Sequence, residues 1–152
     1  MKKLLNSLVE KGKERVRLTR QLQQVLSRVA EDMANALDEG VSTRIDDYKI
    51  FVREYESNIG TYKTIVFSSF DDDNCEWLLG AITDLTIPGE FVYLHNDFRC
   101  TVRVAPRNVF LYFANHLDKI VKEFELKQDT IIESLKGALA KLEDFANAKA
   151  ES

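Results

Sequence analysis

The densest group of potential metal ligands lies in the stretch SSFDDDNCEWLLG, residues 68–80. A calcium-binding EF-hand loop requires glycine at its sixth position and glutamate at its twelfth. Counted from Asp71, those positions hold Glu76 and Ile82 instead, so the pattern fails twice. Aspartate and asparagine are also common in turns, and Asp73 followed by Glu76 fits a helix cap. We therefore interpret this stretch as a turn or helix cap, with a cation site as the alternative.

The histidines and cysteines of the sequence form a second possible metal site. The chain has two of each, at Cys75, His95, Cys100 and His116. Two cysteines and two histidines can bind zinc tetrahedrally, but no pair here has the close spacing of a zinc knuckle. We predict no metal and no cofactor, and we interpret both cysteines as reduced thiols. The alternatives are a disulfide between Cys75 and Cys100 and zinc binding by the four residues.

A catalytic role would require a nucleophile and a base that converge in a pocket. His116 lies near the edge of an apolar helical stripe, beside Asn115 and Asp118. No serine stands in a nucleophile motif, and the sequence has no glycine-rich phosphate loop. We therefore predict a non-catalytic protein. The alternative is a small enzyme with a site at His95 or His116.

The charge of the chain is distributed unevenly. Its net charge is −4, but residues 1–28 hold eight basic against two acidic residues, whereas residues 29–100 hold five against fifteen. Clusters of Lys and Arg can bind phosphate groups or acidic proteins. The candidate partner-binding or phosphate-binding residues are Lys11, Lys13, Arg15, Arg17 and Arg20, with Arg99, Arg103 and Arg107 as a second strip.

Four interpretations of the basic segment remain. The first is nucleic-acid binding, but the pI of about 5.3 and the acidic middle of the chain argue against it. The second is attachment to a membrane surface, but this segment lacks the Trp and Phe side chains of a strong anchor. A plain solvated helix face is the third. We favour electrostatic pairing within an assembly, because the first helix is basic in its leading half and acidic in its trailing half. Antiparallel pairing of two such helices would match opposite charges.

Residues 1–40 predict an amphipathic helix that ends near Leu37 and is stopped by Gly40. From residue 18 onwards its apolar residues recur at steps of three and four, which places them on one face. Upstream, Lys11 and Arg15 interrupt that face. We expect the first dozen residues to form a separate or frayed turn, with Gly12 as the weak point.

Residues 43–105 change to the composition of strands. RIDDYKIFVREYE and TYKTIVFSSF flank SNIG, which predicts a hairpin. EWLLGAITDLT is a possible third strand, and FVYLH and FRCTVRV predict a last hairpin. A tight turn at Asn96-Asp97 would pair Tyr93 with Cys100 and bury the face that carries Cys100 and Val102.

Residues 107–147 return to helical spacing after Pro106, which suits the first turn of a helix. The apolar residues before and after the segment 125–130 share one face, so one long helix of about 40 residues is favoured over a helix pair broken there.

Together these elements predict a single α+β domain spanning residues 1–152: an antiparallel meander of four to five strands flanked by long N- and C-terminal amphipathic helices. The helices would cover one sheet face or pair as an antiparallel coiled-coil arm. Such helices exceed the strands in length about threefold, so a neighbour must cover their surplus apolar surface. We predict a homodimer whose interface residues are Leu18, Leu22, Val25, Val29, Ile131, Leu135 and Leu142.

The predicted function is that of a non-catalytic interaction module: an adaptor, assembly factor or escort chaperone that binds another protein or peptide as a homo-oligomer. The alternative is a nucleic-acid-associated protein that uses the basic first helix. The first 15 residues resemble a signal peptide, but Asn6, Ser7 and Glu10 interrupt their apolar run. The sequence has no apolar run of about 20 residues either, so we expect a cytoplasmic protein.

Overall fold

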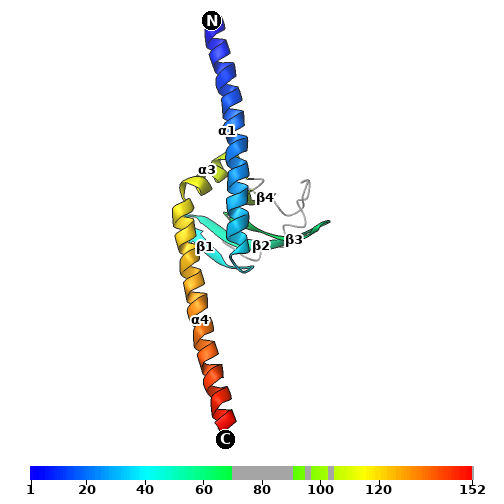
Figure 1. Cartoon of the computed structure of the whole chain (residues 1–152). Helices are drawn as coiled ribbons and strands as arrows, with labels where there is room; N and C mark the ends of the chain where they lie inside the picture. The colour runs from blue at the N-terminus through cyan, green and yellow to red at the C-terminus, as the bar shows by residue number, and fades with distance from the viewer. Residues whose placement is uncertain (70–90, 95–96, 103–104, 152) are drawn as a thin grey trace.

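The computed structural model describes residues 1–69, 91–94, 97–102 and 105–151. It confirms an α+β fold, with an antiparallel sheet between long helices at both ends of the chain (Figure 1). The elements are α1 (Lys2–Asn35), β1 (Ser42–Ile45), β2 (Tyr48–Ser57), β3 (Gly60–Ser68), β4 (Phe91–Leu94), β5 (Asp97–Thr101), α3 (Arg107–Asn115) and α4 (Leu117–Glu151).

Helix α1 is continuous from Lys2 to Asn35. The expected separate or frayed turn around Gly12 was therefore wrong, since the strong helix formers on both sides of this glycine carry the helix through it. Its C-terminal half packs on β3 and buries Leu26, Ala30 and Ala34. The small alanines allow the helix backbone to approach the sheet closely.

The sheet has the strand order β1-β2-β3-β5-β4. The first three strands follow the chain as a meander, and the hairpin predicted around SNIG is confirmed, with Ser57 paired to Gly60. β5 then lies next to β3, and β4 forms the edge. β3 and β4 are separated by residues 69–90, so no short turn forces them to be neighbours. The third strand predicted within this segment, like the aspartate-rich stretch, lies outside the described residues.

A two-residue turn that the sequence analysis missed separates β1 from β2. Ile45 pairs with Tyr48, and Asp46 has a φ of 53°. Aspartate adopts this left-handed conformation more readily than most residues, which makes Asp-Asp a workable hairpin turn. RIDDYKIFV is therefore two strands and not one.

The β4–β5 hairpin exists as predicted, but its register differs. Phe91 pairs with Cys100 and Tyr93 with Phe98, so the predicted Tyr93–Cys100 pair was wrong by two residues. A shift of two leaves the grouping of residues by face unchanged, because the strand period is two. Hydrophobic patterning predicts which face is buried, but it does not distinguish registers that differ by two residues.

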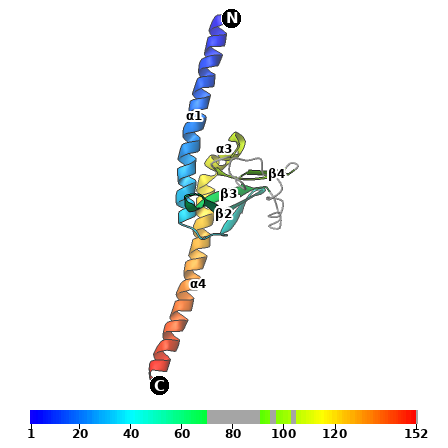
Figure 2. The same cartoon turned by 90° about the vertical axis from the view of Figure 1, so that its right-hand side faces the viewer.

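The helices pack on one face of the sheet (Figure 2). The core between them includes Ile50, Ile65, Phe67 and Cys100 from the strands, together with Val109, Phe113, Ile120 and Phe124 from α3 and α4. The opposite face is also buried where β3 meets β5, at Val66, Ser68, Arg99 and Thr101.

The C-terminal helical segment bends at His116, where φ is −111° and ψ is 13°. The favoured single helix from residue 107 was therefore wrong, although α4 does run without a break through residues 125–130. The bend lets Phe110 and Phe113 of α3 and Ile120 of α4 all reach the core. Asn115, a weak helix former, is the sequence signal that precedes the bend.

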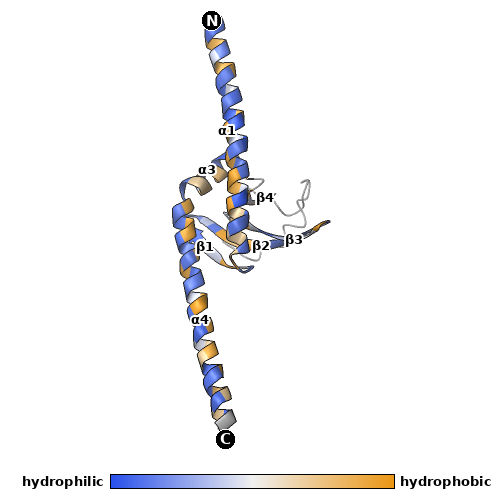
Figure 3. Ribbon diagram, viewed as in Figure 1, coloured by the Kyte–Doolittle hydropathy of each residue, from blue (hydrophilic) through white to orange (hydrophobic). Residues whose placement is uncertain are grey.

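Both long helices extend far beyond the sheet, in opposite directions (Figure 1). We call residues 2–21 the N-terminal arm and residues 129–151 the C-terminal arm. Nearly all described side chains of both arms are exposed. Apolar residues continue along both arms, as the orange segments in Figure 3 show. The two arms thus do not pair with each other within one chain.

Candidate functional site

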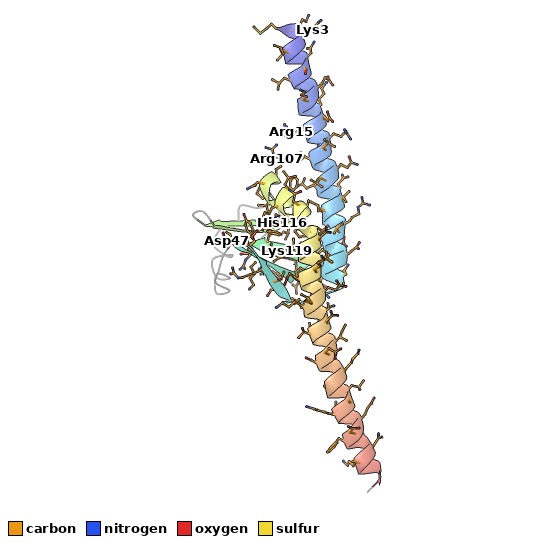
Figure 4. All side chains as sticks on the ribbon, turned by 90° about the vertical axis from the view of Figure 1, so that its left-hand side faces the viewer. Lys3, Arg15, Asp47, Arg107, His116 and Lys119 are labelled. Carbon is orange, nitrogen blue, oxygen red and sulfur yellow. The ribbon has the colours of Figure 1, made fainter. Side chains whose placement is uncertain are left out.

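An open groove of about 530 Å³ lies where α1 leaves the sheet and meets the start of α3. Leu18, Leu22, Phe110 and Leu111 give it an apolar floor, and polar and charged side chains form its rim. The rim residues are Lys11, Glu14, Arg15, Thr19 and Arg107. Figure 4 shows Arg15 on α1 and Arg107 at the start of α3, on the same side of the molecule.

The local sequence explains how α3 presents this groove. Pro106 caps the helix in an extended conformation, with φ −60° and ψ 156°, which suits a residue that lacks a backbone donor. Phe110 then points into the core while Leu111, one residue on, stays 40% exposed. Arg107 in the first turn lies in solvent.

The bend between α3 and α4 is held against the β1–β2 turn by a small polar and aromatic cluster. The hydroxyl of Tyr112 donates to the carboxylate of Asp46. The ring of His116 stacks on Tyr112 with centroids 4.0 Å apart, and Tyr48 meets Tyr112 edge to face at 4.8 Å. These contacts fix the direction of α3 and hence the width of the groove.

Both burial and the contact with Asp46 raise the pKa of Tyr112. Desolvation raises the pKa of Tyr112 well above its usual range, and the hydrogen bond to Asp46 raises it further, because that carboxylate accepts only from the protonated hydroxyl. The Nδ1 of His116 lies 2.8 Å from the carbonyl oxygen of Tyr112, to which a protonated Nδ1 donates.

The structure brings some of the predicted basic residues together and separates others. Lys11, Arg15 and Arg107 share the groove, although the sequence analysis assigned Arg107 to a different strip. A neighbouring surface of α1 carries Lys13, Arg17 and Arg20.

Arg99 lies inside the molecule. It is only 3% exposed, with its guanidinium 5.2 Å from the ring centre of Phe51 and its Nε 3.5 Å from Ser68 Oγ. It therefore cannot form a surface strip with Arg107. The strand pattern predicts burial of the face that carries Cys100 and Val102, but the opposite face, which carries Arg99, is buried as well. Arg103 lies outside the described residues.

The predicted interface residues fall into two groups. Leu18 and Leu22 lie in the groove, with Val25 and Val29 further along α1; Val25 is exposed and Val29 is half-buried. Leu135 and Leu142 are 63% and 67% exposed on the C-terminal arm, where Ile131 is half-buried. The chain does not bring these two groups into contact.

The candidate metal ligands are only partly described. Cys100 is a buried thiol, and burial raises its pKa to about 12, so it is a poor nucleophile. Within the described ranges, no three His, Cys, Asp or Glu side chains gather as metal ligands would. Cys75 and His95 lie outside those ranges.

Phe110 and Leu111 were not predicted as groove residues, and Asp46 and Tyr112 were not predicted as the support of the bend. Phe110 was recognisable only as part of an apolar helical face, and nothing in the sequence indicated that α1 would lie beside it. Asp-Asp between two β-rich runs was the available signal for the turn.

Comparisons of this chain with protein-family models, with curated proteins and with solved structures find no match. In the part of the chain that the structure describes, no helix combines the length and the apolar character needed to cross a membrane.

Proposed function

We propose that this protein is a non-catalytic protein–protein interaction module, an adaptor, assembly factor or escort chaperone, that acts as a homo-oligomer. The observation that carries the proposal is the pair of exposed apolar stripes on two helical arms. The N-terminal stripe consists of Leu4, Leu5, Leu8, Val9, Val16 and Leu18, and the C-terminal stripe consists of Ile132, Leu135, Leu139, Leu142 and Phe145.

A helical arm with an exposed apolar stripe has little stability on its own. Helices owe most of their stability in proteins to packing of an apolar face, and isolated helices of this length are marginal in water. Fully burying one leucine contributes about 1.5–3 kcal/mol. Stripes of five or six large apolar side chains therefore favour a bound state in which another protein covers them.

The groove indicates what kind of segment is bound. Its apolar floor and basic rim suit an amphipathic helix that carries acidic residues beside its apolar face, a mode in which side chains at helical spacing act as anchors. Lys11, Arg15 and Arg107 would orient such a helix, while the exposed side chains of Leu18 and Leu111 would supply most of the binding energy on burial.

Measurement of the solution mass across a range of protein concentrations tests this proposal. We expect the wild-type chain to associate, and we expect Leu8→Glu to weaken association at least tenfold, because it places a charge in the N-terminal stripe. Lys119→Glu, an exposed change on α4 outside both arms, is the matched control and should associate as the wild type does.

A wild-type chain that stays at its monomer mass of 17.5 kDa at every concentration would remove the self-association from the proposal. If Leu8→Glu associated as tightly as the control, the N-terminal stripe would not be the interface.

A second function is favoured by one observation, the exposed basic surface of α1 that carries Lys13, Arg17 and Arg20. This surface could bind nucleic-acid phosphates. Phosphate binding weakens steeply as salt rises, whereas binding through apolar stripes does not. A gel-shift titration with a labelled duplex at low and at physiological salt distinguishes the two, and no shift at low salt would exclude the nucleic-acid function.

A further inference from the structure

We propose that the groove and the N-terminal arm receive the C-terminal arm of a second copy of this chain, in antiparallel orientation, so that two copies exchange arms in a closed dimer. This inference rests on the proposed homo-oligomer and names the surfaces that meet. The stripes and the groove require a helical occupant, and the chain itself carries one that its own fold leaves uncovered.

Charge favours the pairing of unlike arms. The N-terminal arm holds seven basic and two acidic residues, a net of +5, and the C-terminal arm holds three basic and five acidic residues, a net of −2. Pairing two N-terminal arms would place +5 against +5, whereas pairing unlike arms brings opposite charges together. Exposed charges contribute little to affinity but select the partner and its orientation.

The helix dipoles select the antiparallel orientation. The N-terminus of α1 carries Lys2 and Lys3 and has no acidic residue in its first turn, so its charges oppose its own dipole. The last turn of α4 carries Lys149, and Glu143 and Asp144 lie in the turns before it. Antiparallel packing places Lys2 and Lys3 beside the negative end of the α4 dipole and near these two acidic residues, which relieves the mismatch at the start of α1. Parallel packing leaves that mismatch in place.

The two arms match in length and in pattern. At 1.5 Å per residue both are about 30–35 Å long. On the C-terminal arm, Ile131, Leu135, Ala138, Leu142 and Phe145 recur at alternating steps of four and three, which is the spacing of helices that pack along their length. On the N-terminal arm, Leu4, Leu8, Lys11, Arg15 and Leu18 have the same spacing. Lys11 and Arg15 are long enough to lay their carbon chains over the stripe and keep their charges at its edge.

Because of the shape of the molecule, the arm exchange is complete with two copies and forms a closed dimer. α1 and α4 run in the same direction along the long axis, with the two termini at opposite ends (Figures 1 and 2). A two-fold axis perpendicular to that direction sets each N-terminal arm antiparallel to the other copy's C-terminal arm, and both arm pairs form at once. Parallel pairing of unlike arms would instead leave one arm open at each end and build filaments.

Charge reversal of the arms tests the pairing. The double change Lys11→Glu with Arg15→Glu lowers the net charge of the N-terminal arm from +5 to +1. We expect dimer dissociation at low salt to become about five- to twentyfold more favourable, a range set by the small contribution of each exposed charge. Adding Glu143→Lys and Asp144→Lys to the same chain should restore most of the affinity. Lys119→Glu with Lys122→Glu, outside both arms, is the control and should change affinity less than twofold.

The direction in which Lys11→Glu with Arg15→Glu changes the dimer affinity distinguishes the possible pairings. If two N-terminal arms pair, reversal relieves repulsion and tightens the dimer. If two C-terminal arms pair, charge reversal of the N-terminal arm leaves the dimer affinity unchanged. Either result, with a wild-type dimer, overturns the arm exchange and leaves the homo-oligomer standing. A wild-type chain that is monomeric throughout overturns both.

A photo-cross-link fixes the orientation. With p-benzoylphenylalanine in place of Leu8, irradiation of the full chain should join this residue to the tryptic peptide of residues 142–149 of the other copy. Cross-links to the peptide of residues 128–136 would show parallel packing, and cross-links to the other copy's residues 4–11 would show pairing of like arms. Both of these results contradict the proposal.

Discussion

Both halves of α1 carry leucine and valine side chains, but these side chains have opposite surroundings in the two halves. In the C-terminal half, Leu26 is 3% exposed against the sheet, whereas Leu8 in the N-terminal half is 67% exposed. The same contrast occurs in α4, where Phe124 is buried and Phe145 is exposed. Helical periodicity therefore indicates that a face is to be covered, but it does not say whether the cover comes from the same chain or from another.

The largest expected effect is in the sheet-packed region. Phe113→Ala removes a fully buried ring that packs edge to face on Phe67, with centroids 5.5 Å apart. We expect the free energy of unfolding to fall by about 3–5 kcal/mol, as measured by urea denaturation. A loss below about 1 kcal/mol would mean that this region is not the core.

A change in the arms should act on assembly and not on the fold. Leu135→Glu with Leu142→Glu places two charges in the C-terminal stripe. We expect the thermal midpoint of the wild type to rise with protein concentration and that of the variant not to, while circular dichroism still reports the sheet and α1. Equal concentration dependence in both proteins would contradict a role for this stripe.

The bend between α3 and α4 should respond to alkaline pH. Because the pKa of folded Tyr112 is raised, its protonated form stabilises the fold below the unfolded tyrosine pKa of about 10. That contribution is lost as the pH rises above about 10. Tyr112→Phe should cost about 0.5–1.5 kcal/mol at pH 8 for the lost hydrogen bond.

The same variant should lose stability less steeply between pH 9.5 and 11 than the wild type, as followed by the urea midpoint. Phenylalanine cannot ionise, so identical pH profiles for the two proteins would show that the contact with Asp46 is not formed in solution.

The smallest effect is expected for an isolated surface pair. Lys13 and Glu10 are 3.3 Å apart, and both are about 70% exposed. Lys13→Ala should change the free energy of unfolding by less than about 0.5 kcal/mol. A loss above 1 kcal/mol would indicate that this part of the N-terminal arm is buried against another molecule.

The class of fold followed from the sequence because helical and strand periods alternate cleanly along it. The hairpin around Asn58-Ile59 and the long terminal helices were predicted for this reason. The register of β4 and β5 was not, because a slip of two residues preserves every hydrophobic face. The bend at His116 was not predicted, because Asn115 is only a weak signal and no glycine or proline marks the position.

The candidate site was only half predictable. Clustered Lys and Arg identified the N-terminal arm, and helical spacing identified Leu18 and Leu22. The groove itself also needs Arg107 and Phe110 of α3, which lie beside α1 in the folded chain. Such a meeting of distant segments is a property of tertiary packing. Arg99 was predicted to be part of an exposed basic strip, but its side chain is buried.

Amide hydrogen exchange of the arms tests most directly whether another molecule covers them. An uncovered helical arm of about 20 residues frays readily, so its amides exchange fast at any protein concentration. We expect residues 2–21 and 131–145 to be protected at high concentration and to lose protection on dilution, while β3 stays protected throughout. Fast exchange in both arms, unchanged with concentration, would contradict the proposal that their apolar stripes form the contacts between copies.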